Sequence, residues 1–102
     1  MERRGRKRFP ANLEVQFFHD REIHYGVVTD ISDKGMCIKV GVSLPYNSGD
    51  RLLMYLKNEP LRIPYKILWL KKSCNMSDAI GVEVLQLYER HLELVTLVSQ
   101  NL

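Results

Sequence analysis

The sequence predicts an all-β fold, a small six-stranded antiparallel β-barrel with one helix packed on it at the C-terminal end. Three observations support this prediction. Six short runs have the alternating or fully apolar pattern of β-strands, and polar segments rich in turn-forming residues separate them. After Tyr88 the spacing of apolar residues changes from two to three or four, which is typical of an amphipathic helix. The 102 residues are enough for one domain with its own core and too few for two.

The first three strands are expected at residues 12–18, 23–29 and 36–40. In each strand apolar side chains alternate with other residues and form one apolar face. These side chains are Leu13, Val15 and Phe17 in the first strand, Ile23, Tyr25 and Val27 in the second, and Met36, Ile38 and Val40 in the third. Gly26 indicates a bulge in the second strand or a close approach to a neighbouring one.

The other three strands are expected at residues 51–57, 61–69 and 79–87. The first of these is apolar on both faces, which favours a deeply buried strand. The alternating apolar residues of the other two are Leu61, Ile63, Tyr65, Ile67 and Trp69, and then Ile80, Val82 and Val84. Trp69 is expected to fill the core, and Pro64 places part of its strand near an edge or a bulge.

The helix is expected at residues 88–100. Its apolar stripe consists of Leu92, Val95 and Val98, widened by Leu94 and Leu97. This stripe is expected to cover the barrel, and its remaining width could dock a partner or a second copy. Residues 1–102 thus form one predicted domain, with an exposed arm at 1–10, the barrel at 11–87 and the helix at 88–100.

Positive charge is concentrated in the arm. Residues 1–8 carry five basic side chains against Glu2, a net charge of +4, so the rest of the chain accounts for −1 of the total of +3. Proteins that bind long nucleic acids spread Lys and Arg over a face or groove, because affinity comes from neutralising many phosphates. The local charge therefore favours a small anion, bound by a flexible arm that it orders.

The cysteines and histidines predict neither a metal site nor a redox pair. Cys37 and Cys74 lack the C-x-x-C spacing and are expected to be free thiols in a reducing cytoplasm. His19, His24 and His91 are dispersed, and surface or turn positions are expected for them. No metal and no cofactor are predicted.

Catalysis and membrane insertion are not expected either. The sequence holds no Ser-His-Asp or Cys-His set, no glycine-rich phosphate loop and no paired carboxylates on one rigid face. No run approaches the ~20 apolar residues that span a membrane, and the N-terminus is charged where a secretory signal would be apolar. A cytoplasmic protein that is not an enzyme is predicted.

Two motifs point to a nucleotide ligand. Arg4 and Arg8, four residues apart, can each present a planar fork of donors to a phosphate or to the O6/N7 edge of guanine. In the predicted loop between the second and third strands, Asp30, Ser32 and Gly35 follow the pattern D-x-S-x-x-G. The carboxylate of Asp30 can accept from N1–H and N2–H of guanine together, and Gly35 would tolerate a positive φ in the turn.

The chain resembles the PilZ domain family, whose signature is R-x-x-x-R on an N-terminal arm followed by [DN]-x-S-x-x-G between the second and third strands. Arg4 and Arg8 match the first motif, and Asp30, Ser32 and Gly35 match the second. The resemblance extends over essentially the whole chain. It implies a receptor for cyclic di-GMP in which Arg4 and Arg8 clamp phosphate and guanine while Asp30 and Ser32 bind a guanine edge and nearby phosphate or ribose.

Two further residues could join this site. Arg3 directly precedes the arginine motif, and in the family a third arginine there tends to accompany binding of two stacked ligand molecules. Trp69 could instead lie at the margin of the site and stack on a guanine. The expected partners are cyclic di-GMP and an unidentified downstream protein, with the chain a monomer or a ligand-dependent dimer.

Two other functions remain open from the sequence. A small β-barrel with a basic arm could bind RNA or single-stranded DNA, although the nearly neutral body argues against it. A PilZ-like domain could also be a protein-interaction module that ignores the nucleotide, but the motif arginines are intact. Asp30 and Ser32 could serve only to cap a turn.

Overall fold

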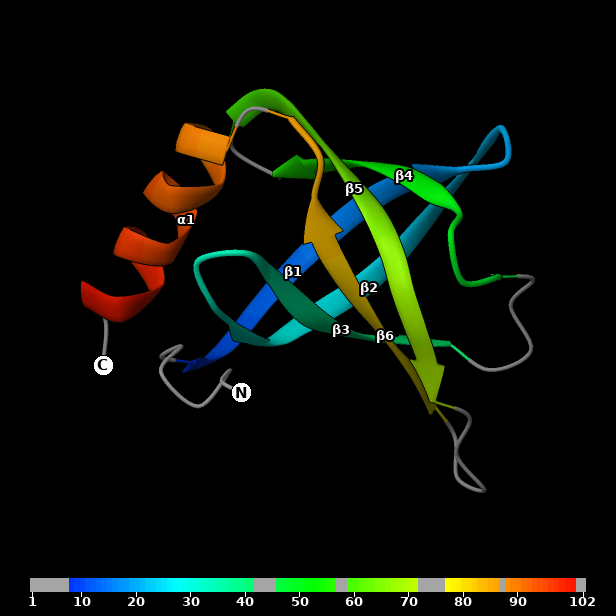
Figure 1. The fold of residues 1–102 in the computed structure, drawn as a ribbon, viewed down its shortest axis with the longest axis horizontal. Coiled ribbons are helices and arrows are strands. Elements are labelled where there is room, and N and C mark those ends of the chain that lie inside the picture. The colour runs from blue at the N-terminus through cyan, green and yellow to red at the C-terminus, as the bar shows by residue number, and fades with distance from the viewer. Residues whose placement is uncertain (1–7, 42–45, 57–58, 72–76, 87, 101–102) are drawn as a thin grey trace.

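The computed structural model describes residues 8–41, 46–56, 59–71, 77–86 and 88–100. Six antiparallel strands form a closed barrel in the order β1-β2-β3-β6-β5-β4, and one helix follows them (Figure 1). The elements are β1 (Phe9–His19), β2 (Glu22–Ile31), β3 (Gly35–Gly41), β4 (Arg51–Leu56), β5 (Glu59–Lys71), β6 (Ser77–Val84) and α1 (Tyr88–Gln100). The predicted six-stranded barrel with a C-terminal helix is confirmed.

The barrel closes because β1 pairs with both β2 and β4. β1 and β2 form a hairpin whose turn residues, Asp20 and Arg21, have φ of 52° and 68°. Two-residue hairpin turns favour this left-handed conformation, because its backbone twist matches that of the flanking strands. Near the start of β1 the register shifts between Pro10 and Leu13, so that β1 has one residue more than β2 there.

Two of the three residues expected to form the apolar face of the second strand are exposed, which corrects the prediction. Ile23 and Tyr25 are 52% and 67% exposed, whereas His24 and Val28 face the core. His24 can lie inside because its Nδ1 is 3.0 Å from the Tyr46 hydroxyl and its ring stacks on Phe17. A hydrogen-bonded imidazole therefore takes a place that alternation alone assigned to the outer face.

Gly26 makes the close approach that the sequence indicates. A Cβ at this position would lie 2.6 Å from Cγ2 of Ile38 on β3. Two residues further on, between Val28 and Asp30, the β2–β3 register shifts. This bulge changes the alternation, so that Ile31 also turns into the core.

Pro64 lies close to a register shift and to the end of a neighbouring strand, as the sequence indicates: the β4–β5 register shifts at Arg62, and the β5–β6 pairing begins only after Pro64. Pro64 pairs with Leu53 inside the β4–β5 ladder of the closed barrel. Its carbonyl accepts the Leu85 amide at 3.0 Å, and the imino nitrogen of a strand residue faces the same side as its carbonyl. That side lies just beyond Val84, where β6 ends, so the missing N–H of proline leaves the ladder intact.

The helix α1 covers the range expected for it, but its buried face is not centred on the expected stripe of Leu92, Val95 and Val98. Only His91 and Leu94 are buried on it, and Val95 and Val98 pack against the core from partly buried positions. Leu97, which was expected to widen the stripe, is exposed. In the part of the chain that the structure describes, no helix has the length and apolar character needed to cross a membrane.

Candidate ligand-binding site

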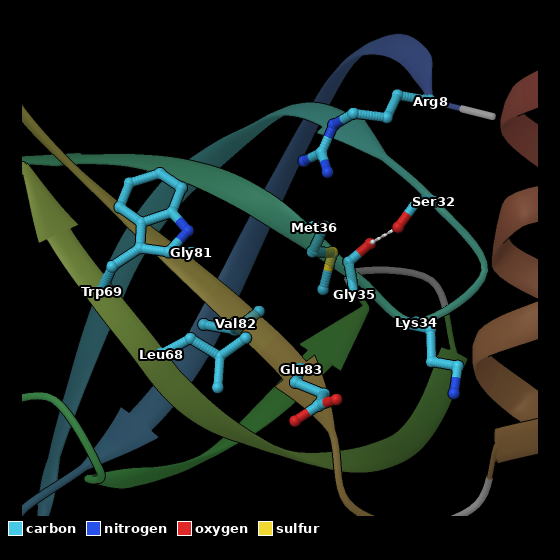
Figure 2. A pocket seen from close by; sticks show the side chains of 10 residues that line it. All are labelled: Arg8, Ser32, Lys34, Gly35, Met36, Leu68, Trp69, Gly81, Val82 and Glu83. Atoms are coloured by element: carbon cyan, nitrogen blue, oxygen red, sulfur yellow. Dashed lines mark hydrogen bonds between the residues drawn. The ribbon is translucent and has the colours of Figure 1, made fainter. Parts of the chain in front are cut away.

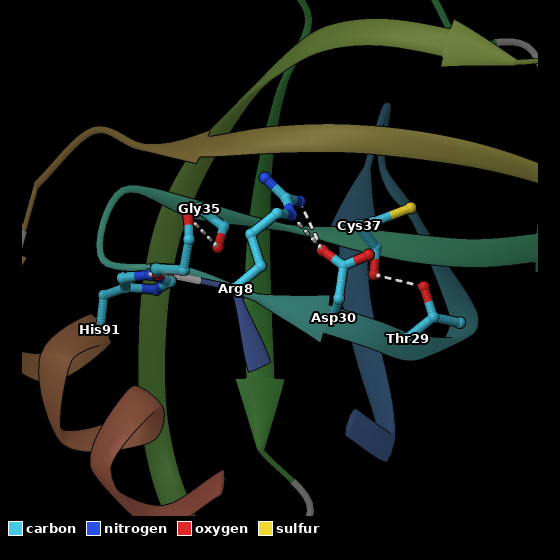
Figure 3. Close-up of polar contacts among 7 residues, drawn as sticks. Arg8, Thr29, Asp30, Gly35, Cys37 and His91 are labelled. Atoms are coloured by element: carbon cyan, nitrogen blue, oxygen red, sulfur yellow. Dashed lines mark hydrogen bonds and ion pairs between the residues drawn. The ribbon is translucent and has the colours of Figure 1, made fainter. Parts of the chain in front are cut away.

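Arg8 and Asp30 meet at the open end of the β1–β2 hairpin. Arg8 directly precedes β1, and Asp30 lies near the end of β2, opposite Pro10. Arg8 Nε donates to Asp30 Oδ1 at 3.0 Å, and its Nη2 donates to the same oxygen (Figure 3). Both side chains remain accessible, at 55% and 34% exposure. The pair is thus open to a ligand from solvent.

The turn between β2 and β3 closes on itself. The Ser32 amide donates to the Gly35 carbonyl at 2.8 Å, and the Ser32 hydroxyl lies 3.5 Å from the same oxygen. The Lys34 carbonyl accepts the Val84 amide at 2.9 Å, which fixes the turn to the end of β6. Ser32 is buried and its hydroxyl contact is at the limit of a hydrogen bond, so this hydroxyl is weakly held.

Gly35 is required for space and not for a positive φ, which corrects the expectation from the sequence. Among the described glycines only Gly49 has a φ in the left-handed region. A Cβ at position 35 would fall 1.9 Å from the carbonyl oxygen of Val82 on β6. The absence of a side chain therefore lets β3 approach β6 beside the turn.

Trp69 lies outside the core, so the prediction that it fills the core is wrong. The β5–β6 register shifts between Ile67, which pairs with Val82, and Trp69, which pairs with Gly81. The extra residue in β5 reverses the alternation, and Trp69 is 42% exposed while Ile67 is fully buried. The indole lies against Gly81, on the face of the barrel that carries the turn (Figure 2).

These residues surround one pocket of about 300 Å³. It is lined by Arg8, Ser32, Lys34, Gly35, Met36, Leu68, Trp69, Gly81, Val82 and Glu83. Figure 2 shows the Arg8 guanidinium and the Trp69 indole on two sides of the hollow. The pocket thus has the Arg8 cation on one side and the Trp69 indole on the other, which suits a flat anionic ligand.

His91 is a buried polar residue at this site that sequence reasoning placed on the surface. Its Nε2 is 2.7 Å from the Ser32 carbonyl oxygen, and its Nδ1 is 2.7 Å from the Tyr65 hydroxyl. Burial lowers the pKa of His91, although the bond to Ser32 and the Asp33 carboxylate oppose this shift. The signal in the sequence was its position three residues before Leu94, on the buried side of the helix.

The other two histidines are also buried, again contrary to expectation. His19 and His24 lie together with Tyr46 in an aromatic cluster near the β1–β2 turn. His19 Nε2 is 2.8 Å from Asp50 Oδ2, and this hydrogen bond lowers the pKa of Asp50. Among the described residues no three His, Cys, Asp or Glu side chains are arranged to hold a metal ion.

Three residues named from the sequence, Arg3 and Arg4 of the arm and Cys74, lie outside the described residues. Of the seven predicted ligand contacts, the described ones are Arg8, Asp30, Ser32, Gly35 and Trp69. All of these except Asp30 line the pocket, and Asp30 is bonded to Arg8 at its margin.

Comparison with known proteins agrees with the fold. The family model described as "PilZ domain" matches residues 2–100. A comparison with curated proteins found no match. The chain resembles the PilZ domain of YcgR from Escherichia coli with c-di-GMP, with a TM-score of 0.75 and 12% identity over 98% of this chain and 94% of that one.

Two longer proteins share the fold. One is the inhibitor of motility MotI/DgrA of Bacillus subtilis, with a TM-score of 0.73 and 16% identity over 99% of this chain and 51% of that one. The other is the MrkH–c-di-GMP complex of K. pneumonia, with a TM-score of 0.71 and 15% identity over 95% of this chain and 52% of that one. The chain therefore spans about half the length of either protein. Since the family model covers nearly the whole sequence and the barrel has the same architecture, the chain belongs to the PilZ domain family.

Proposed function

We propose that this protein is a receptor for cyclic di-GMP and binds it in the pocket between Arg8, the β2–β3 turn and Trp69. One observation carries the proposal: the second residue of the arginine motif and the first residue of the D-x-S-x-x-G motif are bonded to each other at the rim of a pocket with an aromatic wall. PilZ domains are binding domains and not enzymes, and the related YcgR and MrkH structures contain c-di-GMP.

The Arg8–Asp30 pair suits a guanine nucleotide. In the absence of ligand each group satisfies the other, which avoids leaving a bare charge at the rim. A guanine offers N1–H and N2–H to the carboxylate and O6 and N7 to the guanidinium. Adenine lacks the paired donors, so its binding would leave Asp30 desolvated at a cost of about 1–3 kcal/mol.

Trp69 supplies an aromatic face for a base. Its ring is partly exposed beside the pocket and is held in place against Gly81. Stacking of a base on such a ring contributes about 1–3 kcal/mol. The phosphates of the ligand would be met by Arg8 and, in our proposal, by Arg4 and Arg3 of the arm.

We further propose that binding orders the arm and that a partner protein reads the result. The arginines of the arm repel one another until an anion neutralises them, so part of the binding energy is used to order the chain. A third arginine would allow a second, stacked ligand molecule, in which case the stoichiometry would be two ligands per chain.

Titration calorimetry tests the proposal. Cyclic di-GMP, cyclic di-AMP and GTP are titrated into the wild type and the Arg8→Lys and Asp30→Asn variants. Arg8→Lys keeps the charge and removes the fork, and the matched control Arg90→Lys changes an exposed arginine of α1 that pairs with Glu93. We expect the wild type to bind cyclic di-GMP tightly and to bind neither cyclic di-AMP nor GTP. Both site variants should lose affinity for cyclic di-GMP, and the control should keep the affinity of the wild type.

Other outcomes identify the alternatives. Equal affinity of wild type and Arg8→Lys would overturn the proposed site. Binding of RNA that strengthens with oligonucleotide length and weakens steeply with salt would indicate a nucleic-acid-binding barrel instead. Absence of all nucleotide binding would leave a protein-interaction module.

A further inference from the structure

A buried chain of hydrogen bonds connects the barrel core, the helix and the signature turn. Tyr65 of β5 bonds to His91 of α1, and His91 bonds to the Ser32 carbonyl, both at 2.7 Å. Tyr65 and His91 are fully buried, and Ser32 nearly so. Figure 3 shows the His91 ring next to the turn that holds Gly35. Residues 59 positions apart in sequence are thereby joined without solvent between them.

Chemistry fixes the direction of both bonds. A carbonyl oxygen can only accept, so Nε2 of His91 carries the proton and donates to Ser32. The burial that lowers the pKa of His91 favours the neutral ring, whose Nδ1 is then an acceptor. The Tyr65 hydroxyl, which burial keeps protonated by raising its pKa, donates to that Nδ1. One tautomer therefore satisfies all three groups.

His91 is one of the two residues of α1 that are buried against the barrel. The other is Leu94, which offers only apolar contact. His91 is therefore the buried polar anchor of the helix, and its anchor point is a residue of the D-x-S-x-x-G motif. Among the described residues, the His91–Ser32 hydrogen bond thus links α1 directly to the proposed ligand-binding turn.

We propose that His91 positions the β2–β3 turn for ligand and transmits the occupancy of the turn to α1. This inference rests on the proposed function, because the ligand is the one proposed for the pocket. The Ser32 hydroxyl is weakly held at 3.5 Å from the Gly35 carbonyl, so a ligand oxygen can draw it away. The amide, hydroxyl and carbonyl of Ser32 belong to one short turn, and its movement changes the bond to His91.

Amide hydrogen exchange and the ¹⁵N signals of the imidazole rings test this role. Wild type, His91→Phe, His91→Gln and Tyr65→Phe are compared with and without cyclic di-GMP. Phe keeps the ring and removes the donor, whereas Gln can place an N–H near the position of Nε2. Tyr65→Phe removes a core hydroxyl but leaves the His91–Ser32 bond, and thus controls for a purely structural effect.

We expect the ligand to change exchange in α1 and to shift the Nε2 signal of His91 in the wild type, while the signals of buried His24 stay constant. The change in α1 is lost in His91→Phe, restored in His91→Gln and retained in Tyr65→Phe. Without ligand, the Ser32 amide exchanges at least about tenfold faster in His91→Phe than in the other variants, since its turn has lost a support.

Two results would overturn the inference. One is that the ligand changes hydrogen exchange in α1 equally in wild type and His91→Phe, or changes it in neither protein although calorimetry shows binding. The other is that, without ligand, the Ser32 amide exchanges at the same rate in all four proteins. If the wild type does not bind cyclic di-GMP, the proposed function fails, and the ligand-free comparison alone still decides whether His91 positions the turn.

Discussion

The indole of Trp69 lies directly against Gly81 on the neighbouring strand. A Cβ at position 81 would fall 2.1 Å from Cε2 of the ring. The glycine thus lets a large exposed side chain lie flat on β6, beside the pocket that Arg8 and Ser32 also line. Position 81 therefore sets the orientation of the aromatic wall.

Gly81→Ala is expected to displace this ring at little cost to the fold, because Trp69 is partly exposed and can move outward. Trp69 is the only tryptophan of the chain, so its fluorescence reports the change directly. We expect emission at longer wavelength and an affinity for cyclic di-GMP about tenfold lower, the loss of roughly 1.4 kcal/mol of stacking. Unchanged emission would show that the ring is not held by Gly81.

Gly35→Ala is expected to lower the free energy of unfolding by about 3 kcal/mol, because its Cβ would collide with the Val82 carbonyl and not with a movable side chain. The control is Gly41→Ala in the same strand, where a Cβ meets nothing within 4 Å. Its stability should stay within about 0.5 kcal/mol of wild type. Urea denaturation measures both, and equal midpoints for the two variants would contradict the steric account.

Much of this fold follows from the sequence because alternation and period are local signals. The strands at Val15 and Ile38 and the helix at 88–100 lie where the pattern puts them. Bulges are the main source of error, since one inserted residue between Ile67 and Trp69 turns an expected core residue onto the surface. Such an insertion depends on pairing with β6, which no local pattern reveals.

The buried histidines were missed for a related reason. His24 and His91 lie in the interior because tyrosine hydroxyls distant in sequence bond to them. Residue type alone leaves histidine intermediate between surface and interior, and the three-dimensional partner decides where it lies. For Arg8 and Asp30, in contrast, the two motifs were enough to name both residues as ligand contacts, but not to predict that their side chains bond to each other.

Arg8→Ala separates a structural from a ligand-binding role. The Arg8–Asp30 pair is accessible, so its loss should lower the free energy of unfolding by at most about 1 kcal/mol. Loss of a charged hydrogen-bond partner for the ligand should weaken binding by about 1.5–3 kcal/mol, roughly 10- to 150-fold. Thermal denaturation and calorimetry on the same sample test this, and a large drop in stability with unchanged affinity would reverse the assignment.

His91 makes stability depend on pH. Burial lowers its pKa in the folded protein below the ordinary value of 6.5, so below this pH the unfolded chain takes up a proton that the folded one does not. Stability is therefore lost as the pH falls below about 6.5, by at most about 1.4 kcal/mol per pH unit from this group.

Urea midpoints measured from about pH 7.5 to about pH 5.5 test this effect, with His91→Gln as the control that cannot titrate. The wild type should lose stability more steeply than the variant over this interval. Parallel curves for the two proteins would mean that His91 is not held neutral in the folded state.

The central claim is that cyclic di-GMP binds between Arg8, Asp30 and Trp69, and a titration followed by ¹H–¹⁵N NMR tests it most directly. We expect the signals of the Arg8 Nε–H, the Trp69 indole N–H and the amides of Asp30, Ser32 and Gly35 to shift to saturation together, while those of the Asp20–Arg21 turn stay unchanged. Absence of shifts, or shifts centred on the Asp20–Arg21 turn, would contradict it.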